Sequence, residues 1–170
     1  EHPLTPLNRA AFGKLTYAVF AELLAIRQEL GRFFDERIYQ QAVARRRPDV
    51  ALEVPLLVSH GSFRKIFHLD ALLRGGGILE FKATETLVER HIAQLLNYLM
   101  LAELPHGMLV NVRPEQVSKR YVNNVLTNAD RRKFSTRRVE WDAALEGAEE
   151  FASLLLELLN DWGTGLELSL

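Results

Sequence analysis

Two apolar runs joined by a glycine triplet, RKIFHLDALL and ILEFKAT, are the feature of this sequence that most restricts its fold. They occupy residues 64–73 and 78–84, and the glycines between them supply the backbone conformations that a tight turn needs. The preceding run VALEVPLLVSH, residues 50–60, is rich in β-branched and aliphatic residues, which is typical of a strand. Residues 50–84 therefore predict a meander of three strands.

Helical patterns precede and follow this meander. Apolar residues recur at intervals of three and four in residues 15–30, and Gly31 offers a stop for that helix. Residues 33–47 predict a second helix and residues 86–104 a strongly amphipathic third. The rest of the chain predicts strands at 106–112, 119–124 and 135–141, a short helix capped by Thr127, and a last helix at 142–162. This order predicts an α/β domain with a mixed sheet flanked by helices.

Three charged residues, Asp70, Glu80 and Lys82, lie inside the apolar strands. Burying a charge costs several kcal/mol unless another group compensates for it. Alternate side chains of a strand share a face, so Glu80 and Lys82 point the same way. If the two strands pair across the glycines, Asp70 falls about opposite Glu80 to Lys82, depending on the register of the turn. Two carboxylates and an amine are therefore expected at one patch of the sheet.

This patch has two interpretations. Neighbouring carboxylates repel each other, and a divalent cation removes the repulsion; oxygen ligands favour Mg²⁺ or Mn²⁺, which also bind phosphate oxygens. The chain has no cysteine, so a metal would need oxygen or imidazole ligands. Alternatively, the three residues form only a salt-bridged sheet edge. The three residues alone leave both interpretations open.

The spacing Asp-x₉-Glu-x-Lys matches the active-site signature of the PD-(D/E)XK nuclease superfamily. The segments FHLDALL and ILEFKA, with ELGRFFDERIYQQAV before them and HIAQLLNYLMLAELPHGMLVNV after them, resemble the GxxExxY family, a branch of that superfamily. The resemblance covers roughly residues 15–125, and Glu36 and Tyr39 fall on the Glu and Tyr of the family's name motif. Phe33 departs from the motif, because it stands where the family has glycine.

The resemblance implies a restriction-endonuclease-like core over about residues 15–125. Residues 126–170 lie beyond the resemblance and are expected to form a C-terminal helical extension, within a single domain of residues 1–170. It also implies a bound Mg²⁺ (or Mn²⁺). The ligands would be the carboxylates of Asp70 and Glu80 and the main-chain carbonyl of Phe81.

The resemblance assigns catalytic roles to further side chains. Lys82 would position or activate water, and Glu36 would orient water or help to hold a metal. Gln94 and Tyr98 match a Gln-x₃-Tyr helix that occurs in several nuclease branches. Each has a plainer alternative: Glu36 also suits the positive start of a helix, and Gln94 and Tyr98 could be a polar helix edge with a core tyrosine.

The charge of the chain is unevenly distributed, although its net value is −1. Residues 113–138 carry eight basic and two acidic residues, a net of +6, whereas residues 139–170 carry eight acidic residues and no Lys or Arg. The basic block, together with the arginines at 45–47, is a candidate surface for phosphates; alternatively, it is a solvated face balanced by the acidic end. The two could pair within one chain or between two copies, which leaves a homodimer open.

We therefore expect a metal-dependent nuclease that hydrolyses phosphodiester bonds of DNA or RNA. The alternative is a catalytically silent nucleic-acid-binding or scaffold module that keeps the nuclease fold. No apolar run reaches the roughly 18 residues that a membrane span requires, and the N-terminal residues lack the pattern of a signal peptide. A cytoplasmic protein without a membrane partner is the expectation.

Overall fold

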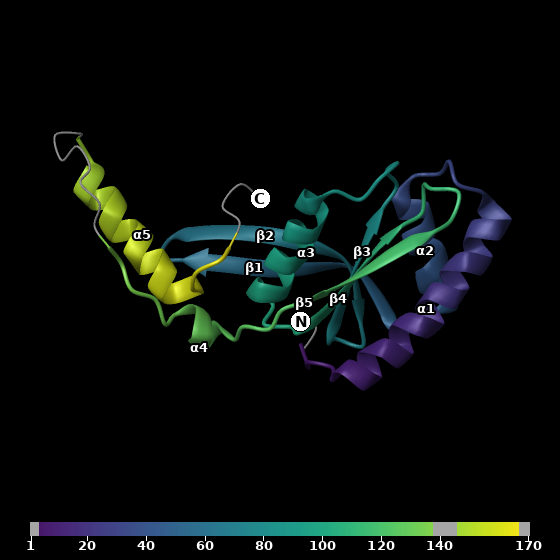
Figure 1. Cartoon of the computed structure of the whole chain (residues 1–170), viewed down its shortest axis with the longest axis horizontal. Coiled ribbons are helices and arrows are strands. Elements are labelled where there is room, and N and C mark those ends of the chain that lie inside the picture. Colours follow the sequence, from purple (N-terminus) through teal and green to yellow (C-terminus); the bar gives the residue numbers. More distant parts are fainter. Residues whose placement is uncertain (1–3, 138–145, 167–170) are drawn as a thin grey trace.

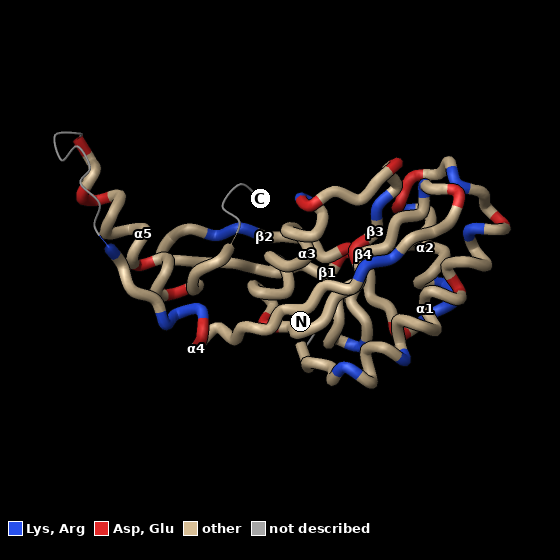
Figure 2. The backbone as a smooth tube through the Cα atoms, in the orientation of Figure 1, with Lys and Arg blue, Asp and Glu red and all other residues tan. Residues whose placement is uncertain are grey.

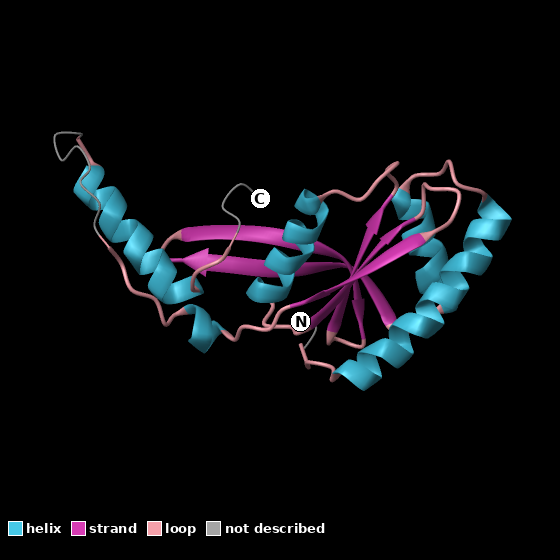
Figure 3. Ribbon diagram, viewed as in Figure 1, coloured by secondary structure: helices cyan, strands magenta, loops and turns pink. Residues whose placement is uncertain are grey.

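The computed structural model describes residues 4–137 and 146–166, which contain five helices and five strands (Figures 1 and 3). In chain order these are α1 (Arg9–Leu30), α2 (Glu36–Arg46), β1 (Val50–His60), β2 (Phe63–Leu73), β3 (Gly77–Lys82), α3 (Glu89–Leu101), β4 (His106–Asn111), β5 (Ser118–Asn123), α4 (Asn128–Arg131) and α5 (Ala148–Trp162).

The five strands form one sheet in the order β1-β2-β3-β4-β5. All neighbours are antiparallel except β3 and β4, which are parallel because α3 carries the chain back between them. The predicted meander corresponds to β1–β3, and the predicted strands at 106–112 and 119–124 correspond to β4 and β5. A mixed sheet flanked by helices confirms the predicted α/β class.

Side chains that alternate along β3 divide the core into two layers, as the pleat of a strand requires. Leu79 and Phe81 are fully buried in a cluster with residues of α1 and α2. Ile78 belongs to a second cluster, which contains Leu95 and Leu99 of α3. The central strands are therefore covered on both faces by helices, and charged groups on β3 lie in a largely apolar environment.

The β1–β2 hairpin extends well beyond the sheet. β1 and β2 pair from Val50↔Leu73 to His60↔Phe63, with an interruption at Glu53 and Asp70, whereas β2 pairs with β3 only over residues 71–73. The outer half of the hairpin thus forms a two-stranded arm that reaches α5 at one end of the molecule (Figure 1). The indole Nε1 of Trp162 donates a hydrogen bond to the carbonyl of Ser59 there, at 3.2 Å.

Two expectations for the C-terminal part need correction. Residues 133–137 are not in a strand, and the rest of the strand expected at 135–141 lies outside the described residues. The last helix begins at Ala148, not near 142, because Gly147 adopts a left-handed conformation (φ 82°) at its start; residues 142–145 lie outside the described residues. In the described ranges, no helix has the length and apolar character that a membrane crossing requires.

Candidate active site

The candidate site lies where β2 separates from β3. Their register, with Leu73 opposite Gly77 and Ala71 opposite Leu79, would next place Asp70 opposite Glu80, but the main-chain pairing ends at Ala71. Asp70 instead accepts a hydrogen bond through its side chain, from the main-chain N–H of Phe81 at 2.8 Å. The carboxylate therefore links the two strands at the point where they diverge, as the antiparallel pairing predicted.

Glu80 and Lys82 form a buried ion pair on β3. Nζ of Lys82 lies 2.7 Å from Oε1 of Glu80, and the two side chains are only 14% and 2% exposed, respectively. The other oxygen of Glu80, Oε2, has no hydrogen-bond partner, and among the residues that the structure describes it is the one buried side-chain oxygen or nitrogen in this condition. An unpartnered carboxylate oxygen in a protein interior is costly unless a further ligand completes it.

Burial and neighbouring charges set the protonation of the two acids. Burial, together with the charge of Asp70, raises the pKa of Glu80 to about 7 despite the nearby Lys82. Burial also raises the pKa of Asp70, against the hydrogen bond from Phe81 and the charge of Lys82. Burial alone would lower the pKa of Lys82, but Glu80, Asp70 and Glu36 outweigh it, and the pKa is raised. Lys82 is thus a charged ammonium group that is stabilised by several neighbouring carboxyl groups.

Helix α2 brings two side chains to the charged cluster of Asp70, Glu80 and Lys82. Asp35 caps the helix by accepting a hydrogen bond from the main-chain N–H of Arg37 at 3.0 Å, so Glu36 is its first residue. Burial raises the pKa of Glu36, and the charges of Lys82 and Asp70 act on it as well. Gln40, which is 3% exposed, forms a hydrogen bond with the Asp70 side chain. We did not select Gln40 from the sequence, although its position four residues after Glu36 places both on one helix face.

Helix α3 contributes the expected Gln94 and Tyr98 pair. Nε2 of Gln94 donates to the hydroxyl of Tyr98 at 3.1 Å. Burial raises the pKa of Tyr98, and the charges of Glu80 and Asp70 raise it further, so its hydroxyl lies within electrostatic reach of the cluster. Tyr98 also packs edge-on against Phe67, with ring centroids 5.9 Å apart. It therefore belongs to the core and borders the charged cluster at the same time.

Two other polar residues stabilise the frame of the site. Tyr39 is fully buried, and its hydroxyl donates to the carbonyl of Gly31 at 2.6 Å, which ties α2 to the end of α1. Asn111, also fully buried, bonds both main-chain groups of Thr84, at 3.1 Å and 2.8 Å. Asn111 lies opposite Lys82 in the parallel register of β3 and β4. The sequence analysis missed Asn111, since an amide in an apolar strand carries no signal of its partner.

The donor set fits a hard divalent cation. The described residues contain no group of three or more His, Cys, Asp or Glu that could hold a metal. A cation would therefore depend on the carboxylates of Asp70 and Glu80, the Phe81 carbonyl and water, which is the mixed oxygen set that Mg²⁺ and Mn²⁺ accept. The unpartnered Oε2 of Glu80 is the observation that supports the fit.

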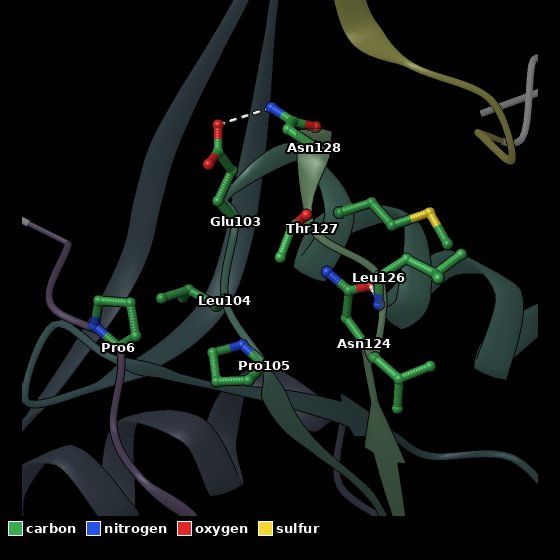
Figure 4. Close-up of a pocket in the computed structure, with 10 residues that line it drawn as sticks. Pro6, Glu103, Leu104, Pro105, Asn124, Leu126, Thr127 and Asn128 are labelled. Atoms are coloured by element: carbon green, nitrogen blue, oxygen red, sulfur yellow. Dashed lines mark hydrogen bonds between the residues drawn. The ribbon is translucent and has the colours of Figure 1, made fainter. Parts of the chain in front are cut away.

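A pocket of about 260 Å³ lies elsewhere, between the end of α3 and the segment before α4 (Figure 4). No residue of the charged cluster lines it; the lining residues are Pro6, Met100, Glu103, Leu104, Pro105, Asn124, Val125, Leu126, Thr127 and Asn128. Its walls are mostly apolar and carry no pair of catalytic groups. The chemistry of this protein is therefore better sought at the charged cluster.

The predicted phosphate-contacting residues differ in availability. Arg131 is 2% exposed and donates hydrogen bonds to main-chain carbonyls, so it cannot contact a substrate. Arg46 pairs with two glutamates of α1, and Arg47 with Asp49. Exposed basic side chains remain elsewhere in the block, among them Lys119, Arg120, Arg132, Lys133 and Arg137.

The chain is similar to known proteins over part of its length. The solved structure of SSO0001 is similar over 55% of this chain and 50% of its own length, with 22% sequence identity and a TM-score of 0.45. The similar part thus spans half of that protein. No curated protein matches the sequence significantly. The family model of the PD-(D/E)XK nuclease superfamily matches residues 13–124, which include every residue of the cluster. The chain belongs to the PD-(D/E)XK nuclease superfamily.

Proposed function

We propose that this protein is a nuclease that hydrolyses phosphodiester bonds of DNA or RNA with a divalent cation, Mg²⁺ or Mn²⁺. The observation that carries the proposal is the buried, unpartnered Oε2 of Glu80 beside Asp70 and Lys82. In a purely structural ion pair, a second buried acid and an oxygen without a partner would only reduce stability. Within the superfamily, we assign the chain to the GxxExxY branch, on the motif residues Glu36 and Tyr39.

The proposed cation ligands are Asp70, Glu80 and the main-chain carbonyl of Phe81. A divalent cation bound there supplies a Lewis acid that lowers the pKa of water and offsets charge on the phosphate. Gln40 holds the Asp70 side chain through a hydrogen bond, and Phe81 N–H fixes one of its oxygens. These contacts orient the acid before any substrate binds, which is what a preorganised site requires.

The remaining side chains act on the water and the phosphate. Lys82, an ammonium group with a raised pKa, directs its charge toward the attacking water and the phosphate oxygens. In this proposal Glu36, whose pKa burial raises, accepts a hydrogen bond from that water. Gln94 and Tyr98 present a donor pair at the border of the cluster and orient the substrate.

Replacing Lys82 tests the proposal directly. We expect Lys82→Ala to reduce cleavage of labelled DNA and RNA in Mg²⁺ or Mn²⁺ by about 10²–10³-fold, the loss typical of one preorganised electrostatic group. Lys82→Arg, which keeps the charge, should stay folded and retain part of the activity. Circular dichroism and thermal melting of each variant separate lost chemistry from lost structure. A folded Lys82→Ala protein that cuts at the wild-type rate would refute the assignment.

The alternative of a silent binding module makes a different prediction about metal. For the enzyme, Mn²⁺ should raise the melting temperature of the wild type, and the rise should disappear in Asp70→Asn. A module that only binds nucleic acid should bind its ligand with no effect of Mn²⁺ on stability in either protein. The two arms thus distinguish the enzyme from a relative that keeps only the fold.

We also propose that two copies associate through the α5 end of the molecule. Apolar side chains stay exposed there on both the helix and the arm, including Phe151 (61%) and Ile66 (57%). Exposed apolar surface of this kind commonly marks an interface. Light scattering should give the mass of two chains for the wild type and of one chain for Phe151→Glu; a monomeric wild type would contradict the proposal.

A further inference from the structure

Phe33 is an apolar side chain that the structure holds in solvent. It lies in the short loop between α1 and α2 and is 75% exposed. Both ends of this loop are fixed: the carbonyl of Gly31 accepts a hydrogen bond from Tyr39, and Asp35 caps α2. The phenyl ring has no polar atom for water to hydrate, and its loop is not free to fold the ring into the core. The exposed ring is therefore a candidate binding surface.

Two guanidinium groups flank the ring. Cζ of Arg32 lies 5.0 Å from its centroid, and Cζ of Arg113, from the segment between β4 and β5, lies 6.0 Å from it. Arg113 is itself anchored, because its Nε donates to the carbonyl of Ala83 at 3.3 Å. Asp35, the acid nearest in the loop sequence, is used by the helix cap. The ring is thus an aromatic surface in a positively charged setting.

This aromatic surface borders the charged cluster. Ala83, which holds Arg113, directly follows Lys82 in the chain. The main-chain N–H of Ala83 also donates a hydrogen bond to the carboxylate of Glu36, which lies three residues after Phe33. A strand whose phosphate reached Lys82 would therefore carry its neighbouring nucleotide past the Phe33 ring.

We propose that Phe33 stacks on an unpaired base next to the scissile phosphate, while Arg32 and Arg113 contact the flanking phosphates. The inference rests on the proposed nuclease function and adds the substrate class, a single strand or an unpaired end. Proteins bind single strands by combining an aromatic platform with basic groups. In a duplex each base is already stacked between its neighbours, so one exposed ring has no free base face to cover.

Binding in EDTA tests this without cleavage. The probes are short fluorescently labelled oligonucleotides, single-stranded DNA, single-stranded RNA and a blunt duplex, and the readout is fluorescence anisotropy. Loss of one stacked base weakens binding by roughly 5- to 100-fold. We expect Phe33→Ala to show that loss on a single strand and little change on the duplex. Phe33→Trp, which keeps a stacking ring, should retain the wild-type affinity.

Two controls make the test specific to stacking. Tyr17 is an equally exposed aromatic residue (75%) on α1, about 20 Å along the helix from its end at Leu30. Tyr17→Ala should therefore bind every probe like the wild type. An abasic strand keeps the phosphates but has no bases, so Phe33→Ala should lose no affinity for it.

The outcomes separate this inference from the proposed function. Equal affinity of Phe33→Ala and the wild type for single strands overturns the stacking role, and so does an equal loss on the duplex and the abasic strand. A wild type that binds no single strand overturns it as well. Cleavage assays of Lys82→Ala are independent of all these measurements, so either conclusion can fail while the other stands.

Discussion

Burying the Glu80 side chain is the main energetic cost of the site. It is 1% exposed, it has one oxygen without a partner, and its pKa is raised to about 7. The ion pair with Lys82 does not repay this cost, since burial and the charge of Asp70 outweigh it. A protein that had only stability to satisfy could replace these charges with apolar residues of similar size. The charged cluster is therefore better explained by function.

The raised pKa of Glu80 predicts how stability changes with pH. An unfolded glutamate releases its proton near pH 4.5, whereas folded Glu80 keeps it up to about 7. Between these values the folded state binds more protons, so the free energy of unfolding falls as the pH rises. The loss approaches 3 kcal/mol, at about 1.4 kcal/mol per pH unit. Urea unfolding in EDTA should show this decline in the wild type, and Glu80→Gln should largely lack it.

A surface glutamate provides the control for this prediction. Glu85 is exposed, so Glu85→Gln should keep the pH profile of the wild type. Added Mn²⁺ should restore stability most strongly above pH 7, where Glu80 is charged and free to bind it. Equal pH profiles for the wild type and Glu80→Gln would mean that Glu80 does not titrate as its surroundings imply.

At the residue scale, the charged residues of the site were predictable because they interrupt an apolar pattern. The buried amides of the site were missed. Asp70, Glu80 and Lys82 stand out because strands seldom bury charges, and alternation along β3 puts the last two on one face. Gln40 and Asn111 stabilise Asp70 and Thr84 through tertiary hydrogen bonds. Nothing in their neighbouring residues marks those partners. The roles of the predicted residues remain predictions, whereas their convergence is a property of the fold.

At the scale of elements, Arg131 joins α4 to its neighbours. Its guanidinium donates to the carbonyls of Met100 at the end of α3, and of Trp162 and Thr164 at the end of α5, at 3.3, 2.6 and 2.8 Å. Helix α5 itself has no buried residue. An isolated helix of about 15 residues is marginal in water, so α5 depends on the contacts at its C-terminal end.

Removing this guanidinium should release α5. We expect Arg131→Met to cost about 2–5 kcal/mol, because several carbonyls lose their donor in a buried site. Hydrogen exchange should become faster in α4 and α5, while β3 and β4 keep their protection. Lys133→Met removes a neighbouring exposed cation and should change neither the stability nor the exchange rates. If β3 and β4 lost protection together with α5, the extension and the core would form one cooperative unit, and the prediction would be wrong.

Elements were predictable where local signals agree, and not where tertiary contacts decide. β1 has the predicted bounds, because a run rich in aliphatic residues begins after Pro48-Asp49 and ends at the turn that follows His60. α1 begins at Arg9, six residues before the predicted start, since Asn8 caps it by accepting from Ala11 N–H. The arm formed by β1 and β2 was not predicted. Its sequence reads as ordinary strand, and only its separation from β3 at Asp70 sets it apart.

At the scale of the whole molecule, the acidic C-terminal helix lies apart from the site, and basic side chains of β5 lie nearer to it. α5 carries acidic residues and no Lys or Arg, and lies at the far end from α1 and α2 (Figures 1 and 2). Lys119 and Arg120 lie on β5, two strands from β3, which corresponds to about 10 Å at the usual strand spacing. A nucleic acid bound at the cluster would therefore pass basic rather than acidic surface.

The salt dependence of binding tests this arrangement. Each phosphate contact adds about 0.7 for a single strand, or 0.9 for a duplex, to the slope of log affinity against log salt concentration. If Lys119 and Arg120 both contact phosphates, Lys119→Gln/Arg120→Gln should reduce that slope by about 1.4 on a single strand. The matched control, Arg46→Gln/Arg47→Gln, removes two charges that acidic partners hold at 2.5 and 2.7 Å, whereas Arg120 has a looser contact of 3.6 Å with exposed Glu89. It should leave the slope unchanged. An equal reduction of the slope in the two variants would mean that binding depends on net charge alone.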